Sequence, residues 1–149
     1  MEKIVFDSGI REYEINEGGV LRFNPSDPNV YARLAEAGEK IQAVETDLVT
    51  KAKAKDAEGD GGAVLRLLEA ADGEIKQILG WVFGSGNDFN EIFGGVNVMG
   101  LGDNGERVIT NFLAALHPIV EAGAQQCAQQ QVDAAVAQAK ADRARRGKA

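Results

Sequence analysis

The sequence feature that most constrains the fold is a loss of large apolar residues within the last third of the chain. From Asp103 to Val120 the large apolar residues recur three and four positions apart, which is the spacing of a wide apolar stripe on one face of a helix. Beyond Glu121 the sequence stays rich in Ala and Gln, but Val132 and Val136 are its only sizeable apolar residues. We therefore predict a helix that is buried in a domain at one end and projects outward at the other. The stripe consists of Val108, Ile109, Phe112, Leu113, Leu116, Ile119 and Val120.

This asymmetry sets the domain organisation. Residues 1–123 are predicted to form one globular domain, and residues 124–149 an Ala/Gln-rich extension that is helical or partly disordered. A domain of this size can bury roughly 70% of its unfolded surface, so it needs no disulfide or metal to be stable. Pro118 removes one helical hydrogen bond and Gly123 is a weak helix former, so a kink or break is expected between the two halves.

Three short antiparallel strands are predicted within residues 3–24. Apolar and polar residues alternate in Ile4–Asp7 and in Ile10–Ile15, and Ser8-Gly9 between them reads as a hairpin turn. A second turn at Asn16–Gly19 leads into a strand at Val20–Phe23. The apolar face of this meander, through Val5, Ile15, Leu21 and Phe23, needs a cover, and the helices are the only candidates.

Helices are expected at about residues 27–52, 62–83, 88–94 and 104–120. Asp27 is a preferred N-cap and Pro28 suits the first helical position. A bend or break is expected near Gly73, and the last helix is placed from Asp103 or Asn104. The fold class is therefore α+β, mainly α: a small N-terminal three-stranded antiparallel β-meander packed on a helical bundle with a long C-terminal helix.

The net charge of −7 is unevenly distributed. Residues 56–106 contribute −8, whereas residues 107–149 contribute +3. An acidic body repels phosphate backbones, which disfavours nucleic acid as a partner. The basic C-terminal end could touch an acidic surface or RNA, although a solvated helix end whose cations complement the helix dipole is the preferred interpretation.

Targeting signals and reactive groups are few. The sequence contains no run of about 18 apolar residues and no signal-like N-terminus, so we expect no membrane span and a protein that stays where it is made. Asp56–Leu67 begins like a calcium loop but has Leu67 in place of the bidentate glutamate, and Gly100–Gly105 lacks the Lys-Ser/Thr pair of a phosphate loop. His117 and Cys127 have no catalytic partner nearby in sequence. We therefore predict a non-enzymatic protein without catalytic, cofactor or metal site, and rank a hydrolase or nucleotide-binding enzyme last.

Three segments carry a resemblance to a known family: VFDSGIREYEI, VLRFNPSDPNVYARLAEAGEKI and EIFGGVNVMGLGDNGERVITNFLAALHPIV. Together they resemble the tail assembly chaperones of phages and prophages of Gram-positive bacteria. The best carriers are Phe23–Asp27, then Phe93-Gly94, and Asn97-Val98. The Ala/Gln tail lies outside the resemblance.

The resemblance implies a function in the host bacterial cytoplasm. Tail assembly chaperones are thought to bind the helical tape-measure protein, prevent its aggregation and deliver it to tail-tube subunits. The alternative is a minor structural or regulatory phage protein, either a virion component or an inhibitor of a host defence enzyme. A second copy of the chain is a further candidate partner, and any single helix contact should be weak because residues 121–139 have little apolar area. The predicted partner-binding residues are Gln125, Gln126, Gln129, Val132, Val136, Arg143, Arg145, Arg146 and Trp81.

Overall fold

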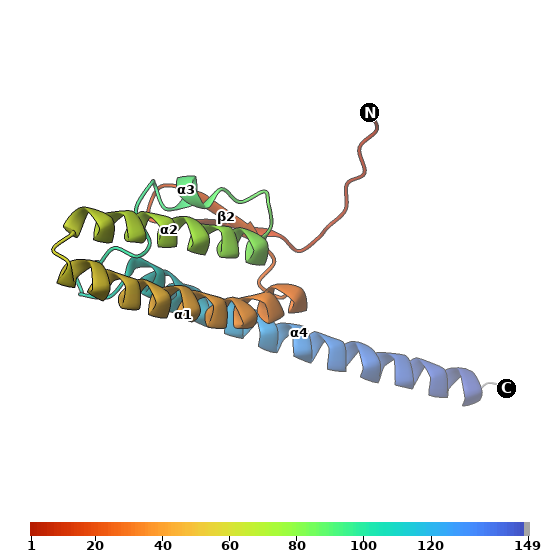
Figure 1. The fold of residues 1–149 in the computed structure, drawn as a ribbon. Helices are drawn as coiled ribbons and strands as arrows, with labels where there is room; N and C mark the ends of the chain where they lie inside the picture. The colour runs from red at the N-terminus through yellow and green to blue at the C-terminus, as the bar shows by residue number, and fades with distance from the viewer. Residues whose placement is uncertain (148–149) are drawn as a thin grey trace.

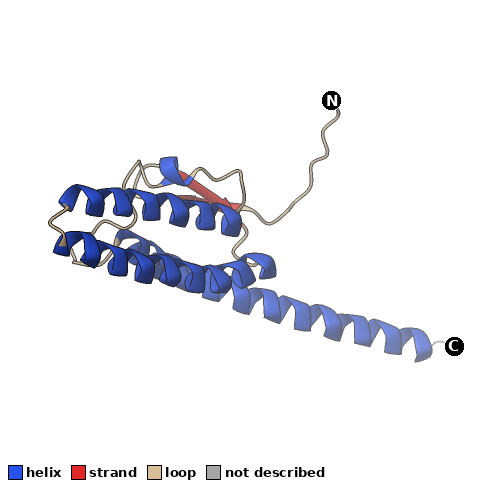
Figure 2. Cartoon of the chain, viewed as in Figure 1, coloured by secondary structure: helices blue, strands red, loops and turns tan. Residues whose placement is uncertain are grey.

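A computed structural model describes residues 1–147 and shows long helices packed beside a small sheet (Figure 1). Helices α1 and α2 form an antiparallel pair, α4 runs along α1, and the sheet and α3 lie next to α2 (Figures 1 and 2). One core joins all of these elements except the far half of α4. The elements in chain order are β1 (Arg11–Glu14), β2 (Val20–Phe23), α1 (Pro28–Ala57), α2 (Gly61–Phe83), α3 (Phe89–Ile92) and α4 (Val108–Gly147).

The sheet is an antiparallel pair of β1 and β2, with Arg11 opposite Phe23 and Glu14 opposite Val20. The predicted turn at Asn16–Gly19 is confirmed: Asn16 and Glu17 have positive φ angles, and the Ile15 amide donates to the Gly19 carbonyl over 2.8 Å. Leu21 and Phe23 alternate with exposed residues and point into the core, as the period of two requires.

The predicted three-stranded meander is wrong, because residues 1–10 form no strand. A two-residue hairpin turn at Ser8-Gly9 needs a positive φ at Ser8, its first central residue. Of these two residues only Gly9 has a positive φ, of 75°. The side chain of Asn24 also donates a 3.2 Å hydrogen bond to the Ser8 carbonyl, which fixes the chain at this point. Residues 1–10 consequently leave the body as an extended arm, and Val5, expected on the apolar face, is exposed.

Caps define the ends of α1 and α2. The Asp27 carboxylate accepts from the Asn29 amide at the N-terminus of α1, where Pro28 is the first helical residue, as predicted. Helix α1 continues to Ala57, beyond the expected end near residue 52, because its last turns are rich in Lys and Ala. Helix α2 begins at Gly61 behind the Asp60 cap and passes through Gly73 without the predicted break. The cost of one glycine is small beside the burial of Ile75 and Leu79 on the same helix.

The one-turn helix α3 is capped by Asp88, whose carboxylate accepts from the Asn90 and Glu91 amides. Its Phe89 and Ile92 are buried in the core, and the short helix predicted at residues 88–94 is confirmed. A continuous series of aromatic contacts, with ring centroids 4.8–6.1 Å apart, links the sheet to α2, α3 and α4. The series runs through Tyr13, Phe23, Phe83, Phe89, Phe93 and Phe112.

The last helix begins at Val108, not at Asp103 or Asn104. Residues 101–107 form a tight turn instead, in which the Gly102 amide donates to the Glu106 carbonyl and Leu101 bridges Arg107. The side chain of Asn104 accepts from the Glu106 amide, and this local bond competes with a helical start.

Helix α4 continues from Val108 through Pro118 and Gly123 to Gly147, so the predicted break does not occur. Pro118 lies on the exposed side of the helix, while Leu116 and Val120 on either side of it are buried and hold the backbone in place. Gly123 is a contact point: a Cβ there would lie 1.9 Å from the Pro25 carbonyl oxygen. The glycine allows α4 to touch the chain just before α1.

Candidate interaction surface

The far half of α4 leaves the body directly after this contact. Gly123 is the last buried residue of the helix, and apart from the partly buried Ala124, Cys127 and Asp142 everything from there to Gly147 is exposed. At 1.5 Å per residue this segment is about 35 Å long. Figure 1 shows it projecting past the other helices toward the C-terminus. The segment 124–147 is called the projecting helix below.

The projecting helix has a physical reason to stay helical without tertiary support. Its nucleus is supplied by the buried half of α4, so only propagation is required, and Ala and Gln propagate well. Hydrogen bonds between residues four apart join Gln129 to Asp133 and Gln138 to Asp142, over 2.9 and 3.2 Å. Such pairs stabilise a helix by roughly 0.2–0.5 kcal/mol each at exposed positions.

Most of the predicted binding residues share one side of this helix. Gln125, Gln129, Val132, Val136 and Arg143 are separated by three, four or seven positions, which places them along a single line on an α-helix. Val132 and Val136 are 56% and 48% exposed and form its apolar centre. The line, here called the seam, comprises Gln125, Gln129, Val132, Val136, Ala139, Arg143 and Arg146.

The seam has the spacing of a coiled-coil contact but an unusual content. Its alternating steps of four and three residues are those by which one helix meets another. It offers less apolar area than a leucine-rich seam does, because it consists of two glutamines, two valines, an alanine and two arginines. The small side chain of Ala139 permits a close approach of a second helix, and the arginines favour an acidic segment opposite the C-terminal end.

Two of the predicted residues on α4 lie off the seam. By helical rotation, Gln126 and Arg145 fall toward the sides and back of the helix. Gln126 lines a separate, mostly polar hollow with Asp7 and Asn24 at the base of the N-terminal arm. Arg145 pairs with Asp142 on its own helix, and both are exposed to solvent.

Trp81 belongs to a different surface. It lies near the end of α2, is 43% exposed, and has the Lys40 ammonium of α1 4.0 Å from its ring centroid. The cation covers one face of the ring, an arrangement worth about 0.5–1 kcal/mol at an exposed site. Trp81 is therefore separate from the seam, and the sequence did not indicate this pairing.

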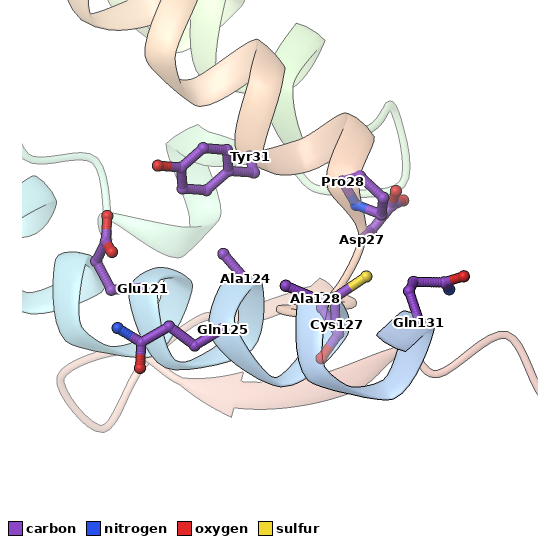
Figure 3. A pocket seen from close by; sticks show the side chains of 10 residues that line it. Asp27, Pro28, Tyr31, Glu121, Ala124, Gln125, Cys127, Ala128 and Gln131 are labelled. Atoms are coloured by element: carbon purple, nitrogen blue, oxygen red, sulfur yellow. The ribbon is translucent and has the colours of Figure 1, made fainter. Parts of the chain in front are cut away.

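A groove adjoins the seam where the projecting helix passes the start of α1. Its volume is about 560 Å³. Pro28 and Tyr31 of α1 face Ala124, Ala128 and Cys127 of α4 across it (Figure 3). Its polar lining includes the carboxylates of Asp27 and Glu121, the Ser26 hydroxyl and the amides of two glutamines, so the groove combines apolar and polar groups. This arrangement suits the side chains of a peptide or helix that lies along α4.

Sequence reasoning missed the α1 side of this groove. Tyr31 is 44% exposed, although its spacing of three from Leu34 is that of the buried face of α1. Its position one turn after Pro28, before the helix becomes enclosed, was the available signal. The groove itself depends on the approach of α4 to Pro25, which no local pattern reveals.

Within residues 1–147, no three His, Cys, Asp or Glu side chains are grouped as a metal site would need. No helix in this range has the length and apolar content to cross a bilayer. No protein-family model matches the chain, and neither the comparison with curated proteins nor that with solved structures gives a match.

Proposed function

We propose that the chain is a non-enzymatic chaperone of phage tail assembly that binds the tape-measure protein through the seam and the groove beside it. The observation that supports this proposal is the projecting helix: about 35 Å of continuous helix without a fully buried residue, attached to a body that has its own core. Most helices in a globular protein are stabilised by packing an apolar face, and this segment is exposed over most of its length. Binding to another helix would bury the seam.

The chemistry of the surface suits a transient partner. Val132 and Val136 supply limited apolar area, so one contact gives modest affinity, and several copies along a long helical partner would add avidity. A chaperone must release its client, and a seam centred on two valines permits release. The acidic body meanwhile keeps the complex soluble.

The test is co-expression with the tape-measure protein encoded in the same phage genome. The intact chain should move that protein into the soluble fraction and co-purify with it. The pair Val132→Asp and Val136→Asp should abolish both effects, because the charges fall at the centre of the seam. The matched control is Ala134→Asp with Ala141→Asp, on the opposite side of the helix, which should behave as the intact chain does.

Three results would count against the proposal. If the tape-measure protein stays insoluble with the intact chain, the chaperone function is wrong. If both double variants act alike, binding does not use the seam. Retention of the chain in purified virions would favour the minor structural component instead.

A further inference from the structure

The N-terminal arm, residues 1–10, exposes three consecutive large apolar side chains. Ile4, Val5 and Phe6 are 90%, 88% and 76% exposed. The base of the arm is held at its attachment point: Asp7 accepts from the Gly9 amide over 2.9 Å, and Asn24 donates to the Ser8 carbonyl. These bonds direct the arm away from the body (Figure 1).

The sheet has one closed edge and one open edge. Asn87 closes the outer edge of β2: its side chain accepts from the Arg22 amide over 2.8 Å and donates to the Arg22 carbonyl over 2.9 Å. Glu12 lies opposite Arg22 in the ladder. Because the backbone groups of Arg22 point away from β1, this is a non-hydrogen-bonded pair, and those of Glu12 point away from β2. No backbone group within residues 1–147 pairs with this edge of β1.

An apolar groove lies beside the open edge, between the sheet and the buried half of α4. Its volume is about 510 Å³. A strand added to β1 would direct every second side chain toward this groove. Its apolar lining includes Tyr13, Ile15, Phe93, Phe112, Leu116 and Ile119.

We propose that the open edge of β1 and this groove receive the N-terminal arm of a second copy of the chain, so that two copies exchange arms. Each copy has both the uncovered apolar strand and the uncovered site, so one two-fold contact buries both. The arm cannot fill its own site as a simple hairpin, because Ser8 lacks the positive φ that such a turn requires. Exchange between copies keeps the same strand pairing without that turn.

Charge selects the antiparallel direction. In that direction Lys3 lies opposite Glu14 of the partner and Asp7 lies toward the Arg11 end of the strand. A parallel register that places Lys3 opposite Arg11 would be repulsive there and would put Asp7 opposite Ile15, next to Glu14, so neither end would gain an opposite-charge pair. In the antiparallel register, Ile4 lies opposite Tyr13, which lines the groove, and Phe6 lies opposite Arg11 on the same face of the sheet, next to the groove.

Sedimentation velocity on the full chain tests the assembly. The intact protein should be a dimer at micromolar concentrations. Ile4→Asp with Phe6→Asp should raise the dimer Kd by about 100-fold or more, roughly tenfold or more for each buried side chain. Leu65→Asp, an exposed leucine on α2, is the control for lost surface hydrophobicity and should leave the Kd unchanged.

A second pair of variants tests the groove. Ala115 lines the groove and is exposed, so Ala115→Arg should fill it without disturbing the fold and should yield a monomer with the thermal transition of the intact protein. Ala114→Arg, one position away and also exposed, lies outside the groove and should remain dimeric. A monomeric intact protein, or a dimer that persists in both the arm variant and Ala115→Arg, would overturn the proposal.

Cross-linking distinguishes exchange from folding back. In a Cys127→Ala background, a tagged chain with Lys3→Cys is mixed with an untagged chain with Glu14→Cys and oxidised. Directly opposite residues of this kind lie about 5.5 Å apart, within disulfide range, so a mixed dimer should form. No mixed dimer, together with an internal disulfide when one chain carries both cysteines, would show that the arm folds onto its own strand and would refute the exchange.

Discussion

Gly123→Ala is the substitution that tests how α4 meets the body. An alanine in a helix interior normally stabilises by about 1 kcal/mol relative to glycine. At Gly123 the new Cβ would lie 1.9 Å from the Pro25 carbonyl oxygen and 2.4 Å from its carbonyl carbon. Both are backbone atoms, so no side-chain rotation relieves the clash and the helix itself must move.

The expected result is a net loss of about 1–3 kcal/mol in the free energy of unfolding, the usual range for overpacking. For a domain of this size that lowers Tm by about 2–4 °C per kcal/mol. Gly38→Ala and Gly73→Ala provide matched controls, because nothing lies within 4 Å of a Cβ at either helical position. Both controls should gain about 0.5–1 kcal/mol.

Urea denaturation followed by circular dichroism measures all three variants on one scale. Gly123→Ala should lower the free energy of unfolding, whereas both controls should raise it. If Gly123→Ala stabilises as they do, α4 does not approach Pro25 and the start of the projecting helix is misplaced.

Three further predictions concern the core and its independence from the projecting helix. Deleting residues 124–149 should leave a cooperative unfolding transition at nearly the same Tm, because the deleted segment contributes little to the core; loss of the transition would show that it supports the fold. Phe112→Ala, at a buried aromatic, should cost about 3–5 kcal/mol in urea denaturation and the half-buried Leu113→Ala clearly less, whereas equal costs would mean the wrong face of α4 is buried. Asp72→Ala should cost about 3–5 kcal/mol by the same assay, because it leaves the buried Lys76 ammonium without its counter-charge, with only the Val96 carbonyl as acceptor, and removes the acceptor of the Val98 amide; a cost below about 1 kcal/mol would mean this network is solvated.

Helix positions were predictable where the signal was local. Asp27 and Pro28 marked the start of α1, because a cap uses atoms within three residues. The short helix α3 was likewise predicted at nearly its observed position, and its Asp88 cap is local in the same way.

The errors arose where distant contacts decide the local structure. Helix α4 begins only at Val108 because, besides the local bond of Asn104, Arg107 is held by Glu45 of α1 and by the Met99 carbonyl, at 2.8 and 2.7 Å. The first hairpin failed because Asn24, far along the chain, fixes the Ser8 carbonyl. In both cases the local pattern allowed two conformations and a side chain from elsewhere selected one.

The candidate interaction surface was predictable only where it depends on local sequence. The shortage of apolar residues after Glu121 indicated an exposed helix, and the valines on it followed from composition. The groove beside Tyr31 and the groove beside the open edge of β1 could not be predicted, because each is formed by segments that only the fold brings together.

Hydrogen exchange on the full chain, alone and with the tape-measure protein, tests the central claim most directly. Amides of residues 125–147 should exchange quickly in the free protein, because solvent-exposed helical hydrogen bonds open readily, and slowly in the complex. The amides of α1 and α2 should be protected in both states. Protection by the partner that appears only in the body, with residues 125–147 unchanged, would contradict the account.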